Sequence, residues 1–134
     1  MPPHLTNARR SDAADAVTPH CDGGFFRLYT APMPADADTP LSGQTVLAEC
    51  GFASPAFAPA VNGVATAHPF TEDASASGTG DAAWFRCVEA DGTTVVYDGT
   101  VGLVGSGADL EMNRLDVVAG SNVAISGFTY TQAR

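Results

Sequence analysis

The stretch Ala82–Gly99, AAWFRCVEADGTTVVYDG, decides the fold prediction for this chain. Two runs rich in β-branched and aromatic residues flank Asp91-Gly92, a dipeptide that accepts the positive φ angles of a tight primed turn. A two-residue loop fixes the partners across the hairpin, which are Val88 and Val95, Arg86 and Tyr97, and Cys87 and Val96. Because both faces are apolar or amphipathic, we expect the hairpin to lie inside a sheet that is covered on both sides.

Length and composition indicate a single domain. The chain has 134 residues, of which 45% are hydrophobic, so it can bury a core without metals or disulfides. Its apolar runs are far shorter than the ~20 residues of a membrane-spanning helix, and we expect no membrane partner. The first residues, MPPHLTNARRSDAADAV, carry charges where a signal peptide has an apolar stretch, which favours folding in the cytosol.

The charge balance is strongly acidic. The chain has six arginines, no lysine and fifteen Asp and Glu residues, so its formal net charge is −9. Such a surface repels phosphate backbones, so we expect no nucleic-acid partner. It suits association with a basic or neutral protein surface. The alternative is that this composition reflects a GC-rich or salt-adapted genome.

The N-terminal segment has a helical pattern. Residues 6–18 are expected to form one short helix, with Thr6 as its N-cap and with Pro19 and Gly23-Gly24 after its end. Its apolar side is made of Ala8, Ala13, Ala16 and Val17. Because so small an apolar side cannot hold an isolated helix, the helix must dock on another part of the chain or on a neighbour. We therefore expect an N-terminal arm at residues 1–24 and a β-domain at residues 25–134.

From Phe25 onward the pattern is typical of β-strands. Besides the hairpin, strands are expected at Phe25–Ala31, Gln44–Ala53, Gly63–Pro69, Ala108–Met112 and Ser121–Thr131. About seven or eight short strands with frequent turns predict a mainly β fold with one short N-terminal helix. The expected architecture is an antiparallel β-sandwich of jelly-roll or immunoglobulin-like type.

Several positions within these segments carry further expectations. The strand at Gln44–Ala53 alternates, and the residues expected on its buried face are Val46, Ala48, Cys50 and Phe52. In the last strand, Val123 and Ile125 have the opposite parity to Phe128 and Tyr130, so a β-bulge is expected at Gly127. Phe57 is expected to fill a gap in the core. Ala31–Gly43, which holds three prolines, and Thr71–Asp81 are expected to be surface loops.

The three cysteines are Cys21, Cys50 and Cys87. They are odd in number, far apart and without a Cys-x-x-Cys pair, so the sequence predicts buried free thiols rather than a zinc or redox motif. The run His20-Cys21-Asp22 offers three metal-ligand types in a row. Since adjacent residues rarely converge on one ion, a metal site there is the less favoured alternative.

The sequence provides little support for catalysis. His4, His20 and His68 lie in a tail, a loop and a strand end, and no Gly-x-Ser-x-Gly turn accompanies them. The absence of lysine excludes Schiff-base chemistry and a Walker-type phosphate grip. Gly102–Gly107, GLVGSG, is interpreted as a flexible turn rather than a phosphate loop, because no helix-forming run follows it. We therefore predict a non-enzyme with no catalytic residues, cofactor or metal.

Two carboxylate pairs and one aromatic set are the remaining candidate sites. The pairs Asp36 with Asp38 and Asp109 with Glu111 could hold calcium, but their spacing does not fit an EF-hand, and solvated acids are the simpler interpretation. The predicted register places Trp84, Arg86 and Tyr97 on one hairpin face, where they could stack on a sugar. The alternative is a core tryptophan with Arg86 lying over Tyr97.

The chain resembles a family of small tailed-phage and prophage virion structural proteins, across almost its whole length. The resemblance begins with the N-terminal helix and its Asp22-Gly23-Gly24 end. The further segments that carry it, in order, are Phe26–Glu49, Ser54–Arg86, Ala90–Gly102, Ala108–Asn113 and Val118–Thr131. Cys50 and Cys87 stand where the family more often has aliphatic residues, which agrees with buried thiols. The family has no assigned catalytic residues to carry over.

This resemblance implies a structural role. The first hypothesis is a capsid decoration, or cement, protein that binds the major capsid protein and stabilises the head shell. It would be assembled in the host cytoplasm and lie on the capsid exterior as a homo-oligomer, for which a trimer would match local three-fold axes. The alternatives are a structural protein of the head–tail junction or tail, and a glycan-binding β-module on the virion surface.

Overall fold

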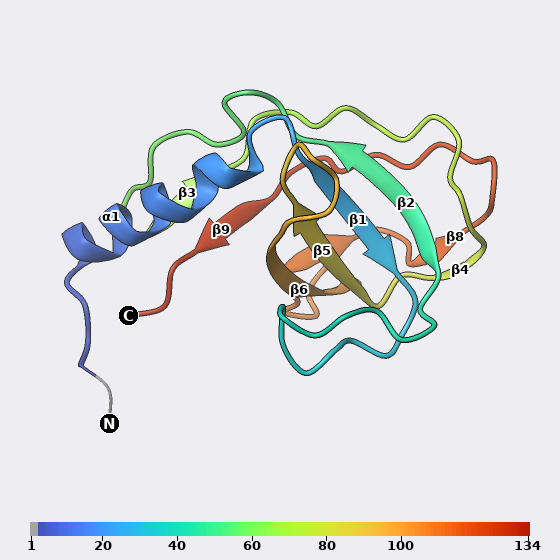
Figure 1. The fold of residues 1–134 in the computed structure, drawn as a ribbon, viewed down its shortest axis with the longest axis horizontal. Coiled ribbons are helices and arrows are strands. Elements are labelled where there is room, and N and C mark those ends of the chain that lie inside the picture. The colour runs from blue at the N-terminus through green and yellow to red at the C-terminus, as the bar shows by residue number, and fades with distance from the viewer. Residues whose placement is uncertain (1–2) are drawn as a thin grey trace.

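The computed structural model describes residues 3–134 as a mainly β protein with one short N-terminal helix (Figure 1), which confirms that part of the prediction. The chain begins with the helix α1 (Asn7–Val17) and a short 3-10 helix, η1 (Thr18–Cys21). The strands that follow are β1 (Phe25–Tyr29), β2 (Val46–Gly51), β3 (Val64–Thr66), β4 (Gly80–Asp81), β5 (Trp84–Val88), β6 (Val95–Leu103), β7 (Leu110–Met112), β8 (Asp116–Val117) and β9 (Thr129–Thr131).

Five of the strands form the main sheet, in the order β2-β1-β5-β6-β7. The full antiparallel sandwich is not confirmed, because β7 runs parallel to β6 and the other strands form only the two-stranded sheets β3–β9 and β4–β8. The second layer is instead largely irregular chain. Its segments are rich in Gly, Ala and Ser, which pack poorly as strands, and they contribute single large side chains to the core.

Aromatic rings make up the centre of that core. Phe26 is fully buried and stacks on Phe85 with 4.3 Å between ring centroids. Its other ring neighbours, Phe52, Phe70 and Phe128, come from the irregular segments. Phe57 is buried against Phe52 and Phe128, which confirms its predicted position. Each such ring pair adds about 0.5–1.5 kcal/mol beyond the burial of its apolar area.

The hairpin lies at the centre of the sheet, as predicted, and every residue of β5 is buried. Its turn differs from the prediction. Gly92 has a φ of +77°, but Asp91 does not adopt a positive φ. The backbone hydrogen bond that closes the turn runs from the Gly92 N–H to the Glu89 carbonyl over 2.9 Å. The Asp91 carboxylate accepts from the N–H groups of Thr93 and Thr94, and these bonds stabilise a wider loop than the primed turn.

The register of the hairpin also differs beyond the first pair. Val88 faces Val95 as predicted, but a β-bulge then leaves Val96 without a partner. Cys87 therefore faces Tyr97, and Arg86 faces Asp98. Because a slip of one residue moves side chains to the opposite face, the bulge sends Tyr97 to the core side and Asp98 to the side of Arg86.

A second bulge changes the predicted face of β2. Leu28 pairs with Ala48 and Tyr29 pairs with Val46, so Leu47 is the extra residue, and it is fully buried. Ala48 and Cys50 are buried as expected. Val46 instead lines a groove on the opposite face, beside Arg27 and Tyr29.

Two segments differ from their predicted structure. Thr71–Asp81 is more than a surface loop, since Thr71 pairs with Gly51, Asp73 pairs with Val123, and β4 ends the segment. Only Thr129–Thr131 of the predicted last strand is regular. Val123, Ile125 and Phe128 are nevertheless all buried, so the predicted change of parity near Gly127 occurs in extended, irregular chain rather than at a β-bulge.

The helix α1 lies beside β3 and β9 at one side of the main sheet (Figure 1). Thr6 is its N-cap, as predicted, with its hydroxyl accepting from the Arg9 N–H. The predicted apolar face is only partly right: Ala13 and Val17 are half-buried, Ala8 and Ala16 are exposed, and the buried residue of α1 is Ala14. No helix within residues 3–134 has the length and apolar character needed to cross a membrane.

Polar contacts hold α1 in place. The Arg10 Nε donates to the Gln132 carbonyl over 2.9 Å. Ser11 Oγ accepts from the Gly63 N–H over 3.0 Å, and Asp15 Oδ1 accepts from the Ala60 N–H over 2.9 Å. We call these three side chains, Arg10, Ser11 and Asp15, the α1 clasp.

Candidate functional site

The outer face of the main sheet carries Arg86, the buried charged residue among residues 3–134. Alternation along β5 turns Trp84 and Arg86 to this face and Phe85 to the aromatic core. Trp84 is fully buried and stacks on Tyr29 of the neighbouring strand, with ring centroids 4.7 Å apart. Its indole N–H donates to the Thr30 carbonyl over 2.8 Å, at the start of the long loop 31–43.

Arg86 and Asp98 form a buried, bidentate ion pair between β5 and β6. Their side chains are only 6% and 4% exposed. The Arg86 Nε donates to Asp98 Oδ1 over 2.7 Å, and Nη2 donates to Oδ2 over 2.9 Å. These hydrogen bonds raise the pKa of Arg86, so the guanidinium stays charged in spite of its burial.

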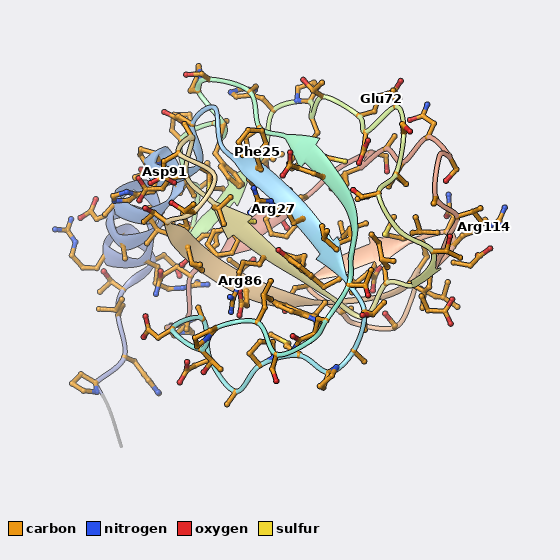
Figure 2. All side chains as sticks on the ribbon, turned by 45° about the vertical axis from the view of Figure 1, so that its right-hand side comes forward. Phe25, Arg27, Glu72, Arg86, Asp91 and Arg114 are labelled. Atoms are coloured by element: carbon orange, nitrogen blue, oxygen red, sulfur yellow. The ribbon has the colours of Figure 1, made fainter. Side chains whose placement is uncertain are left out.

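Arg86 also holds the loop 31–43. Its Nη2 donates to the Thr39 carbonyl over 2.9 Å, and its guanidinium lies over the Trp84 ring at 5.3 Å from the centroid. Figure 2 shows Arg86 beside this loop, which follows β1. A second contact comes from Gln44, whose side-chain amide donates to the Pro32 carbonyl over 2.7 Å. We call four side chains the loop clamp: Trp84, Arg86, Asp98 and Gln44.

The clamped loop presents two apolar side chains to solvent. Met33 is 39% exposed and Leu41 is 44% exposed. Between them, Asp36 Oδ1 accepts from the Asp38 N–H and the Thr39 hydroxyl, which fixes a local turn. Hydrogen bonds from the sheet therefore hold the backbone at Thr30 and Thr39, and Gln44 ties the end of the loop to its start at Pro32.

A polar groove of about 490 Å³ lies between this loop and the segment 71–78. Its floor includes Arg27, whose Nε donates to Glu49 Oε2 over 2.6 Å and whose Nη1 donates to the Gly92 carbonyl over 2.9 Å. Asp73 on the far wall accepts from the Glu49 N–H. These charged groups of the groove already bind partners within the protein.

The predicted sugar platform does not form. Trp84 and Arg86 share a face, but the bulge at Val96 places Tyr97 on the core side, where it packs against Phe128 and Tyr130. Trp84 is closed to solvent, as in the alternative of a core tryptophan. That alternative was wrong in one respect, because Arg86 lies over Trp84 rather than over Tyr97.

All three cysteines are buried free thiols, as predicted. The Cys21 thiol contacts the Tyr97 hydroxyl at 3.8 Å, and Cys50 contacts the Val123 carbonyl at 3.6 Å. Burial raises the pKa of Cys21 and of Cys50 to about 11, and it raises the pKa of Cys87 well above its usual value. Burial also raises the pKa of Tyr97.

The metal-site candidates do not gather into a ligand set. His20 points to Glu89, with 3.3 Å between Nδ1 and Oε2, while Cys21 is buried and Asp22 accepts from the Ala56 N–H. Across residues 3–134, no group of three or more His, Cys, Asp and Glu side chains is placed to hold a metal ion.

The second carboxylate pair stabilises the β6–β7 connection. Asp109 accepts from the N–H and hydroxyl of Thr100, and Glu111 accepts from the Gly107 N–H. The run Gly102–Gly107 ends β6 and turns toward β7, with positive φ values at Gly105 and Gly107. It is a turn, as interpreted from the sequence.

Sequence reasoning missed two features. Asp98 was not identified, because its meeting with Arg86 depends on a bulge that no local signal marks. The turn Asn62-Gly63 had a clear signal, since Asn-Gly is a strong marker of a two-residue hairpin loop. Both residues have positive φ values, 51° and 80°, and the flanking Val61 and Val64 exchange backbone hydrogen bonds.

Comparisons with known proteins give no relative. No protein-family model matches the chain, and neither a curated protein nor a solved structure matches it.

Proposed function

We propose that this chain is a structural component of a phage virion, a decoration protein that binds the major capsid protein on the outside of the head shell. The resemblance of the chain to small tailed-phage and prophage virion structural proteins supports this role. A protein of this kind works through shape and adhesion, so it needs a rigid body with a fixed, exposed contact element. It acts as a binding component rather than an enzyme.

The clamped loop is the observation that carries the proposal. Burying the charged pair Arg86–Asp98 is costly, and in this protein the pair is used to hold a backbone carbonyl of the loop. Because the loop is already ordered, binding through Met33 and Leu41 loses little conformational entropy. A decoration protein gains from such preorganisation, since each copy must bind a repeated site in one orientation.

The charge of the molecule supports the choice of partner. A net charge of −9 without lysine disfavours nucleic acid and suits a basic or neutral protein surface. Within this proposal the copies associate around local symmetry axes of the shell, and a trimer fits three-fold positions.

Binding to shells tests the proposal. Shells from a phage whose gene for this chain is deleted are mixed with the purified protein and sedimented. The expected result is saturable binding at many equivalent sites per shell, which is weakened by the double variant Met33→Ser/Leu41→Ser. Val61→Ser is the matched control, because Val61 is 70% exposed but lies on a different turn.

Two results would overturn the proposal. One is the absence of binding to the shells. The other is binding of only a few copies at the neck or tail, which would place the chain at the head–tail junction or in the tail. Equal binding by the double variant and the wild type would remove the loop 31–43 as the contact element.

A further inference from the structure

The turn Asn62-Gly63 joins an exposed asparagine to a glycine whose backbone N–H is hydrogen-bonded to another part of the protein. Asn62 is exposed, whereas Gly63 is buried under the Arg10 side chain. Asparagine followed by glycine is the dipeptide most prone to deamidation, because glycine has no side chain to hinder attack by its own backbone nitrogen. In this protein that N–H donates a hydrogen bond to Ser11 Oγ of the α1 clasp over 3.0 Å.

We propose that Asn62 is a site of spontaneous deamidation whose rate is controlled by the docking of α1 through Ser11. The Gly63 nitrogen attacks the side-chain carboxamide carbon of Asn62, a new C–N bond closes a five-membered succinimide, and ammonia leaves with the proton from nitrogen. Water then opens the ring to aspartate or isoaspartate. No oxidant or reductant takes part.

The hydrogen bond to Ser11 opposes the first step. To attack, the Gly63 nitrogen must lose its proton to water and turn toward the Asn62 side chain. While α1 is docked, the N–H points to Ser11 instead. The Val61–Val64 hydrogen bonds on either side of the turn further restrict its rotation.

The helix that provides this protection buries little apolar surface. At 11 residues, α1 is shorter than the ~12–15 that an isolated helix needs to persist. Arg9 and Arg10 lie near its N-terminus and Asp15 near its C-terminus, which opposes the helix dipole. With Ala14 as its buried residue, α1 depends for its docking mainly on the three polar contacts of the α1 clasp, and each undocking exposes the Gly63 N–H to water.

Deamidation would also change the surface on which α1 docks. Either product places a new carboxylate next to Gly63, against which the Arg10 side chain packs, so the new charge competes with the Gln132 carbonyl for the Arg10 guanidinium. Isoaspartate further adds a methylene to the backbone of a two-residue loop and disrupts the Val61–Val64 pair. The reaction therefore weakens the docking of α1 as the protein ages, whatever the partner of the folded protein is.

The rate of deamidation at Asn62 tests the proposal. The folded protein is incubated at mildly alkaline pH, and deamidated peptides are quantified over time by mass spectrometry, with the urea-unfolded chain as the unprotected reference. Asn7, Asn113 and Asn122, none of which precedes glycine, are internal controls. Circular dichroism verifies that each variant folds.

The expected result is slower deamidation of Asn62 in the folded protein than in the unfolded chain, and a several-fold increase in Ser11→Ala. Asp15→Ala loosens α1 without touching the Gly63 N–H and should accelerate the reaction too. Arg9→Gln alters an exposed side chain outside the clasp and should not. Equal rates in the folded and unfolded wild type, or wild-type rates in both clasp variants, would overturn the proposal.

Discussion

Arg86 and Asp98 show how much of this protein depends on single side chains. The pair is bidentate and almost closed to water, and it joins two central strands to the loop 31–43. Removing one partner of such a pair leaves a buried charge without compensation.

We therefore expect Arg86→Met to lower the free energy of unfolding by about 3–5 kcal/mol, measured by urea denaturation. The double variant Arg86→Met/Asp98→Leu removes both charges and should recover much of that loss. Arg114→Met, at the exposed pair Arg114–Asp116, is the matched control and should change stability little. An equal effect of Arg86→Met and Arg114→Met would contradict the role of burial.

The buried thiols give a prediction for alkaline pH. Unfolded thiols lose their protons from about pH 9, whereas folded Cys21 and Cys50 keep them up to about 11. Since the unfolded state then binds fewer protons, stability is complete below pH 9 and falls between pH 9 and 11. Urea denaturation at several pH values across this range measures the free energy of unfolding. A free energy that does not change with pH would contradict the prediction.

The same burial predicts thiol reactivity. At neutral pH the folded protein should not react with a thiol reagent such as DTNB, and the urea-unfolded chain should react at all three cysteines. Rapid labelling of the folded protein would show that a thiol is accessible. The burial of Cys50 and Cys87 was predictable from the single residues, because a small apolar side chain at a strand position is buried in most registers, whereas Cys21 lies in η1 and carried no such signal. The partner of Arg86 was not predictable, because it depends on a bulge.

At the scale of elements, the β5–β6 ladder positions both the core and the loop clamp. Gly99 faces Phe85 across the ladder, and the Phe85 ring lies directly over the glycine. A larger residue at this position would displace a ring that also stacks on Phe26.

We expect Gly99→Ala to lower the free energy of unfolding by about 1–3 kcal/mol, because the added methyl group overpacks the core. Gly127 is the matched control, since a methyl group there would meet no atom within 4 Å. Gly127→Ala should stay within about 0.5 kcal/mol of the wild type in the same urea titration. Equal effects of the two variants would show that Phe85 moves aside freely.

Strands were predictable where alternation was strong, and turns were less so. The pattern of Phe25–Tyr29 and of the hairpin arms identified β1, β5 and β6. The type of turn between β5 and β6 was wrong because Asp91 uses its carboxylate to bind the Thr93 and Thr94 N–H groups, a local choice that competes with the primed turn. Segments such as 121–128 bury side chains with a single bridge, between Val123 and Asp73, rather than a ladder, so period-two patterns overestimate their strand content.

At the scale of the whole molecule, the sequence indicated one mainly β unit but not how its layers close. The parallel placement of β7 and the irregular second layer depend on contacts between distant segments, which local patterns do not encode. The clamped loop, the feature on which the proposed function depends, likewise follows from three-dimensional packing around Arg86.

A cryo-electron microscopy reconstruction of particles that carry this chain tests the central claim most directly. The account predicts density for its five-stranded sheet at symmetric positions on the outside of the head, with the loop 31–43 against the major capsid protein. Density found only in the neck or tail, or particles without any density for the chain, would contradict it.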